Sequence, residues 1–352
     1  MPNVPPEDGS VHKRRPRYAG KNPRAFHQKY KELNPDRYAD EVAKILASGK
    51  TPAGMHLPIM VREVLECLRP APGEFAVDCT LGGGGHSRAI LERLMPGGRL
   101  IGLDVDPLEL PRTEAMLRAA GYGTDAFEPR HSNFAGLAQV LAAAGVASAD
   151  IVLADLGVSS MQIDNPVRGF SYKNAGPLDM RMNPARGEPA SALLARADEA
   201  TVATWLTDNA DEPYAVDIAA ALKRETLLTT QAVDRVVRGA LLDANPAMSK
   251  PDIKASVRRT FQALRIAVND EFGVLEALLR TLPLCLSAGG RVAIITFHSG
   301  EDRRVKKAFQ AGKRDGVYAD IATDVIRSTK EETFANRRAS SAKLRWAVRA
   351  SY

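Results

Sequence analysis

The chain has 352 residues, of which 45% are hydrophobic and 26% charged, and its formal net charge is +6. This is the composition of an ordinary globular protein, and no apolar run approaches the ~20 residues of a membrane span. Three scattered cysteines exclude a disulfide framework and a cysteine-based zinc site, and no convincing metal site can be built from the six histidines. The length exceeds one typical domain, so we expect one large domain with an insertion or a second domain.

Charge is spread unevenly along the chain. Residues 1–50 carry a net charge of +5 and residues 300–352 a net charge of +6, whereas the middle carries −5. Basic ends favour contact with phosphate groups, although they are equally typical of chain ends that only maintain solubility. We interpret residues 1–52, rich in proline and charge, as a flexible basic arm without a targeting signal, and we expect a cytoplasmic protein.

From Met55 onward, the apolar pattern alternates between helix and strand. Helices are predicted over residues 59–68, 88–94 and 109–120. Strands are predicted over residues 75–79, 99–103, 127–131, 151–154 and 291–297. Such alternation indicates an α/β protein with a mostly parallel sheet. A basic helix over residues 301–309 and a strand over residues 344–348 complete the pattern.

Far more residues separate strands 151–154 and 291–297 than the dozen or so that a single crossover needs. Helical spacing marks residues 190–206, 215–224 and 231–242, and a helix over 257–282 is expected to pack on the sheet again. We therefore expect a mainly helical, substrate-recognising insert over residues 162–256. Residues 53–161 and 257–352 would form the cofactor-binding domain.

A glycine run follows the first predicted strand and opens a helix. Residues 78–87 read Asp-Cys-Thr-Leu-Gly-Gly-Gly-Gly-His-Ser. Glycines let the backbone approach a ligand closely, and a helix start offers free N–H groups to an anion. Ser87 stands where the dinucleotide fingerprint needs its third glycine, which disfavours a nicotinamide or flavin cofactor. The pattern favours another nucleoside cofactor, and a tight turn is the alternative.

Two aspartates end strands at the same predicted edge of the sheet. Asp104 follows strand 99–103, where a carboxylate can accept hydrogen bonds from both ribose hydroxyls, and Asp155 follows strand 151–154. Phe134 could lie against an adenine ring, or it could be a core residue. His86 could contact the cofactor, or it could make a hydrogen bond at the helix start.

At these residues the chain resembles the MraW family of bacterial methyltransferases, which modify cytosine N4 in small-subunit ribosomal RNA. The resemblance extends over about residues 55–349. Its motifs lie at residues 56–60, 78–87, 102–107, 133–135, 155–162, 168–172, 176–182, 260–266, 297–303 and 340–345. Two departures stand out: Gly300 replaces the family's usual leucine, and the segment before Met55 is longer than the family's usual start.

The resemblance implies a class I, Rossmann-like fold that binds S-adenosyl-L-methionine (SAM), with a helical insert. It implies that the glycine loop contacts SAM, that one residue binds the ribose and another lies near the adenine, and that two more complete the pocket. In this order the residues are Gly83, Gly84, Gly85 and His86 of the loop, Asp104, Phe134, and Asp155 with Gln162. The implied reaction is methyl transfer to a cytidine N4 in the decoding region of small-subunit rRNA, which tunes decoding. The implied partner is this RNA, within the small ribosomal subunit.

Methyl transfer to a cytosine amino group benefits from an acceptor that orients the nitrogen lone pair. Asp155 is the first candidate for this catalytic role, and binding of SAM is its competing role. The base must be unstacked to reach the pocket.

The other candidates for substrate binding lie in the insert and in the basic helix after it. Phe170 and Tyr172 are candidates for stacking on the base, with aromatic packing within the insert as the alternative. Arg168, Arg181 and Arg303 are candidates for phosphate contacts, and His298 is a further candidate for substrate binding. For Arg303 a solvated helix face is an equal alternative, and Arg181 could pair with Asp179.

Two rival functions remain at this point. One is a SAM-dependent methyltransferase that acts on another macromolecule, since fold alone does not identify a substrate. The other is a non-enzymatic ribosome-binding protein with a degenerate cofactor loop, against which the intact Asp104 and Asp155 count. Whether the chain forms a homodimer stays open.

Overall fold

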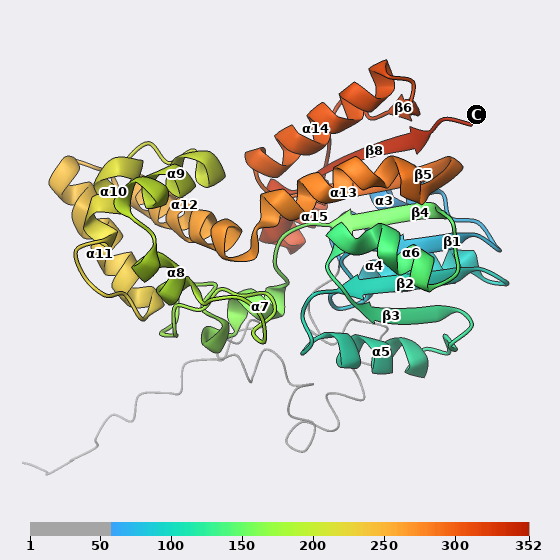
Figure 1. Ribbon diagram of the computed structural model, residues 1–352, viewed down its shortest axis with the longest axis horizontal. Coiled ribbons are helices and arrows are strands. Elements are labelled where there is room, and N and C mark those ends of the chain that lie inside the picture. The colour runs from blue at the N-terminus through green and yellow to red at the C-terminus, as the bar shows by residue number, and fades with distance from the viewer. Residues whose placement is uncertain (1–57, 352) are drawn as a thin grey trace, which may run out of the picture.

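The computed structural model describes residues 58–351, so the expected arm over residues 1–52 lies outside the described residues. The described chain has two parts: a sheet covered by helices on both faces, and a group of helices beyond the ends of its strands (Figure 1). No helix in this range is both long and apolar enough to cross a membrane.

The sheet has eight strands, in the order β3-β2-β1-β4-β5-β8-β6, with β7 paired to β8. Their bounds are β1 Phe75–Asp78, β2 Arg99–Asp104, β3 Phe127–His131, β4 Ala149–Asp155, β5 Leu286–Thr296, β6 Tyr318–Ile321, β7 Ile326–Arg327 and β8 Lys343–Arg349. The pairs from β3 to β5 are parallel, and β8 pairs antiparallel with its neighbours. The predicted α/β fold with a mostly parallel sheet is confirmed.

Helices cover both faces of this sheet because the central strands are apolar on both sides. In β1, Ala76 packs with one face and Val77 with the other. One face carries α3 (Val61–Leu68), α4 (Gly85–Leu94) and α5 (Leu110–Ala119). The other carries α6 (Leu137–Ala143), α13 (Glu271–Cys285) and α14 (Ser299–Arg314). Since both cores are apolar, the strand ends are left as the polar edge where a ligand can bind.

The inserted helices form a separate hydrophobic core. They are α8 Ala190–Arg196, α9 Glu199–Ala210, α10 Ala215–Leu222, α11 Thr230–Ala244 and α12 Lys250–Asn269. The single helix expected over residues 190–206 is two helices, because Ala197 is extended and Asp198 caps α9 by accepting a hydrogen bond from Thr201 N at 2.7 Å.

The helix expected over residues 257–282 is also two helices. Asp270 adopts a left-handed conformation, with φ 48°, and separates α12 from α13. Ile253, Val257 and Phe261 of α12 are buried in the core of the insert, whereas α13 packs on the sheet. The expected boundary at residue 256 falls inside α12, so we propose that the inserted unit ends at Asn269.

Candidate active site

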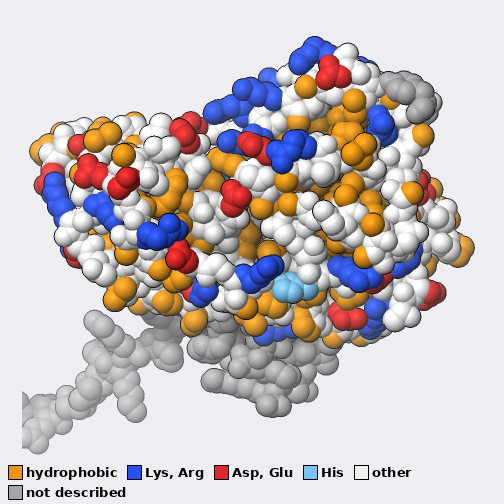
Figure 2. Space-filling model, in the orientation of Figure 1, with side chains coloured by type: hydrophobic (Ala, Val, Ile, Leu, Met, Phe, Trp, Pro, Cys, Tyr) orange, Lys and Arg blue, Asp and Glu red, His pale blue; other side chains and the backbone are white. Residues whose placement is uncertain are grey.

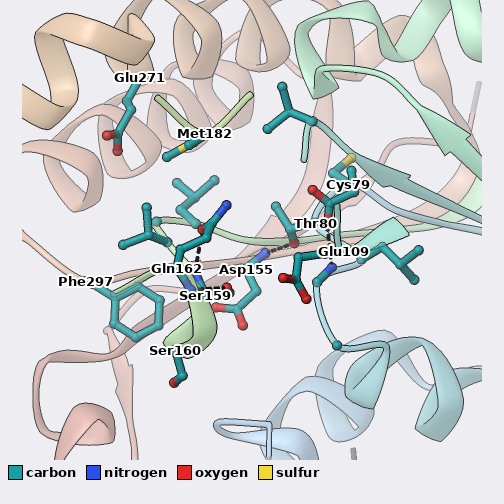
Figure 3. A pocket seen from close by; sticks show the side chains of 18 of the residues that line it. Cys79, Thr80, Glu109, Asp155, Ser159, Ser160, Gln162, Met182, Glu271 and Phe297 are labelled. Carbon is teal, nitrogen blue, oxygen red and sulfur yellow. Dashed lines mark hydrogen bonds between the residues drawn. The ribbon is translucent and has the colours of Figure 1, made fainter. Parts of the chain in front are cut away.

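A cavity of about 440 Å³ opens where β1, β2 and β4 end. Its walls come from the glycine loop and strand ends, from α7 (Ser160–Asp164), from the α12–α13 junction, and from η4 (Arg337–Ser341). Figure 3 shows Glu109, Asp155 and Gln162 grouped in the middle of the view, with Glu271 and Met182 on another wall. The cavity therefore lies between the sheet and the insert, as expected for a site that joins a cofactor to a large substrate.

The glycine loop is kept open by close packing behind it. Gly84 has φ 72°, and a Cβ atom there would lie 2.7 Å from Thr113 Cγ2. A Cβ atom on Gly85 would lie 2.7 Å from Pro58 Cγ. A side chain fits at neither position. The backbone of Gly83 and Gly85 and the His86 side chain line the cavity, whereas Gly84, a predicted SAM contact, packs against α5 and is not among the lining residues.

Asp104 connects the end of β2 to the glycine loop. Its Oδ2 accepts a hydrogen bond from Gly82 N at 2.8 Å, and its Oδ1 accepts one from Asp106 N at 2.8 Å. Burial raises the pKa of Asp104 to about 6, against the lowering effect of these two hydrogen bonds. The carboxylate is thus held rigidly in the pocket wall, where the sequence predicts a ribose contact.

Asp155 ends β4 and faces His86. Its Oδ2 lies 3.7 Å from His86 Nδ1, while its buried Oδ1 has no hydrogen-bond partner among the described residues. The Ile59 carbonyl oxygen, 2.9 Å from His86 Nε2, accepts a hydrogen bond that fixes the ring. Burial raises the pKa of Asp155 to about 6. An unpartnered buried carboxylate oxygen is costly, which indicates that a ligand completes it.

Gln162 lines the pocket, but its amide is already engaged. Its Oε1 accepts a hydrogen bond from Ser159 N at 2.9 Å, and its Nε2 donates to Asp106 Oδ2 at 2.8 Å. Arg168 donates to the same Asp106 oxygen at 2.6 Å and to the carbonyl of Met182 at 2.8 Å. Gln162 is therefore held in one orientation in the pocket wall by a buried hydrogen-bond network.

The structure differs from the sequence-based expectation for Arg168. This side chain is only 7% exposed and is bound on several sides, so it supports the pocket and is not displayed to an RNA phosphate. The burial of Arg168 could not be predicted from the sequence, because its partner Asp106 follows β2 and is 62 residues away in the chain.

Phe170 and Tyr172 pack against the insert core, and neither lines the pocket. The Tyr172 ring meets Phe261 edge-on, with 5.3 Å between ring centroids, and the Arg168 guanidinium lies 5.8 Å from the Phe170 ring centroid. These contacts agree with the alternative given in the sequence analysis, in which both aromatic rings pack within the insert. Phe134, in contrast, lines the pocket beside Asn133, where an adenine contact is expected.

The remaining substrate candidates lie outside the pocket. Arg181 makes a bidentate ion pair with Asp179, in which Nε donates to Oδ1 at 2.9 Å and Nη2 donates to Oδ2 at 2.7 Å. His298 contacts Glu301 at 3.1 Å at the start of α14. Arg303 is exposed and lies 3.4 Å from Asp211 of the insert. Of these three, Arg303 is the most accessible to a large substrate.

Glu109 is a pocket residue that the sequence analysis missed. It precedes α5, is 6% exposed, and its Oε2 is buried without a hydrogen-bond partner among the described residues. Burial raises its pKa to about 7. Its position five residues after Asp104 was the only signal in the sequence, and a glutamate before a helix is ordinary.

Within residues 58–351, no group of three or more His, Cys, Asp or Glu side chains is arranged to hold a metal ion. Cys79 and Cys285 are buried free thiols, and burial raises the pKa of both.

Comparison with known proteins identifies the family of this chain. The model of a family described as the MraW methylase family matches residues 53–350. A relative from Alkaliphilus metalliredigens, named ribosomal RNA small subunit methyltransferase H 2, is 49% identical and covers 96% of this chain and 97% of its own. Relatives named ribosomal RNA small subunit methyltransferase H 1 are 46% identical in Lachnoclostridium phytofermentans and 47% in Agathobacter rectalis. They cover 97% and 96% of this chain, and 94% and 98% of their own. The resemblance stated from the sequence is confirmed, and the chain belongs to the MraW methylase family.

Proposed function

We propose that this protein transfers a methyl group from SAM to the N4 amino group of a cytidine in the decoding region of small-subunit rRNA, tuning decoding. The observation that carries the proposal is the pocket in which the open glycine loop, Asp104 and the unpartnered Asp155 oxygen meet, in a chain of this family. The substrate would be RNA within the small ribosomal subunit, in the cytoplasm.

The residues of the pocket fit SAM. Gly82, Gly83 and Gly85 line the cavity without side chains, so a ligand can lie against their backbone, and Asp104 has lone pairs for ribose hydroxyls. His86, Phe134, Asp155 and Gln162 would surround the remainder of the cofactor. When bound, SAM supplies an electrophilic methyl group on a positively charged sulfur.

Asp155 is the residue we propose for activation of the acceptor. The lone pair of the cytosine N4 is conjugated into the ring, so the amino group is a poor nucleophile until it is oriented. Asp155 Oδ1, buried and unpartnered, would accept a hydrogen bond from this amino group and turn its lone pair toward the methyl group. As N4 gains the methyl group it loses a proton, which this carboxylate would take up.

RNA would approach over the junction of the sheet and the insert. Arg303, exposed on α14 and paired with Asp211 of the insert, lies where both parts meet. Lys306 and Lys307 are also exposed on α14, and Figure 2 shows lysine and arginine side chains gathered over this helix. A flipped cytidine would then enter the cavity from this side.

The test is methyl transfer from radiolabelled SAM to unmodified small subunits, naked small-subunit rRNA and large subunits, followed by nucleoside analysis. We expect label in N4-methylcytidine, with small subunits as the preferred substrate. Transfer to another nucleoside or to large subunits would contradict the proposed acceptor. If SAM binds without transfer to any of the three, the protein acts on a different macromolecule. Absence of SAM binding would favour a non-enzymatic ribosome-binding protein.

A further inference from the structure

Glu109 faces the pocket without a partner that explains its burial. Its side chain lines the cavity near Asp155 and Gln162 (Figure 3), and its Oε2 accepts no hydrogen bond from a described residue. The one ion pair that it makes among these residues is a long one: Oε1 lies 3.5 Å from Nη1 of Arg112, which is itself 45% exposed and does not line the cavity. A buried carboxylate held so weakly is a destabilising feature unless a ligand satisfies it.

The charges around Glu109 do not explain its presence either. Arg112 on α5 and Arg168 from the insert favour its ionised form, but Asp104 and Asp106 on the loop after β2 oppose it, and burial is the largest effect. A folding role would be served better by an apolar side chain at this position. Glu109 is thus a hydrogen-bonding group that is directed into the cavity beside Asp104.

We propose that Glu109 accepts a hydrogen bond from a ribose hydroxyl of the cofactor and is, with Asp104, a specificity-determining residue for the ribose diol. The inference rests on the proposed function, because that function supplies the cofactor. Both oxygens of Asp104 already accept a backbone N–H group, from Gly82 and Asp106, so each has one lone pair left for the diol. Glu109, whose Oε2 has no partner among the described residues, would share the diol with Asp104, so that each carboxylate accepts a hydrogen bond from one hydroxyl.

The test is calorimetric binding of S-adenosylhomocysteine and of its 2′-deoxy and 3′-deoxy analogues. Glu109→Leu fills the same space without an acceptor, and Glu109→Gln keeps an amide oxygen in place. The control Arg112→Ala removes the ion pair and leaves the pocket wall unchanged. We expect Glu109→Leu to weaken binding of S-adenosylhomocysteine about tenfold, with Glu109→Gln in between and Arg112→Ala like the wild type. Thermal unfolding of each variant checks that it is folded.

The analogues separate a contact from a structural effect. Removing a hydroxyl should weaken binding to the wild type, and for one of the two analogues this penalty should fall to a few-fold or less in Glu109→Leu. Unchanged penalties for both analogues, or equal losses in Arg112→Ala and Glu109→Leu, would overturn the inference and leave the proposed function intact. A wild-type protein that binds no S-adenosylhomocysteine would overturn both together.

Discussion

Burial raises the pKa of three of the carboxylates that line the cavity. The values are about 6 for Asp104, about 7 for Glu109 and about 6 for Asp155. Each group therefore favours its neutral form more than it would in water, and at neutral pH its ionised form lowers the free energy of unfolding. Groups that oppose folding and face a cavity are typical of functional sites.

We predict that Asp155→Asn lowers the rate of methyl transfer by about 10²–10³-fold, while the affinity for SAM changes only a few-fold. Asparagine keeps the shape of the side chain but cannot take up the proton. Single-turnover transfer and calorimetric binding measure the two effects separately. Equal losses of rate and affinity would show that Asp155 only binds the cofactor.

The same role predicts a pH dependence. Because the ionised carboxylate is the active form and its pKa is about 6, transfer at saturating SAM should fall as the pH drops through this value. Saturation matters, since Asp104 titrates in the same range and would act on cofactor binding. Asp155→Asn should lose this dependence, and a profile unchanged in the variant would assign it to another group.

Among the elements, a buried polar network joins the insert to the sheet edge. Asp106, in the loop after β2, accepts hydrogen bonds from Gln162 of α7 and from Arg168 of η3 (Pro166–Arg168). Within the insert, Asn269 at the end of α12 donates to Met180 O at 2.8 Å and connects α12 to the segment that follows Arg168. These contacts hold the helical unit against the pocket that it helps to enclose.

We predict that Arg168→Met lowers the free energy of unfolding by about 3–5 kcal/mol, because it leaves Asp106 buried without its charged partner. Arg181→Met is the matched control. It removes an ion pair with Asp179 whose side chains are 21% and 23% exposed, and it should cost about 1 kcal/mol or less. Urea denaturation measures both, and similar losses would mean that the Arg168 network has no special structural role.

At the scale of the whole molecule, the sheet and the insert meet around the cavity, and the exposed basic side of α14 lies beside their junction (Figures 1 and 2). Ser299 and Arg303 both contact Asp211 across this junction. A large polyanion could therefore bridge the two parts while one of its bases reaches the cavity.

We predict that replacing Lys306 and Lys307 together by glutamine weakens rRNA binding and lowers the slope of log affinity against log salt by about 2, one for each lost phosphate contact. Affinity for SAM should not change. The control replaces Lys250 and Lys254, exposed at the end of α12 remote from α13, in the same way. Filter binding at several salt concentrations measures the slope, and equal effects of the two pairs would argue against α14 as the RNA-facing helix.

Local patterns in the sequence were enough to predict the alternation of strands and helices, the glycine loop and the strand-end positions of Asp104 and Asp155. These features depend on local rules: apolar periodicity marks an element, and a polar residue at the end of a parallel strand falls on the ligand-binding edge. The family followed from motifs spread over most of the chain.

Which polar residues are buried, and which partners they have, became clear from the three-dimensional packing and could not be predicted from the sequence. Arg168 supports the pocket because Asp106, which is distant in the sequence, accepts its hydrogen bond. Phe170 and Tyr172 are partly buried because they pack against the core of the insert. From the sequence, Glu109 is an ordinary residue at the start of a helix, whereas in the structure it is buried in the wall of the cavity. Burial and hydrogen-bond partners depend on elements that are distant in the sequence, and local patterns carry no information about those contacts.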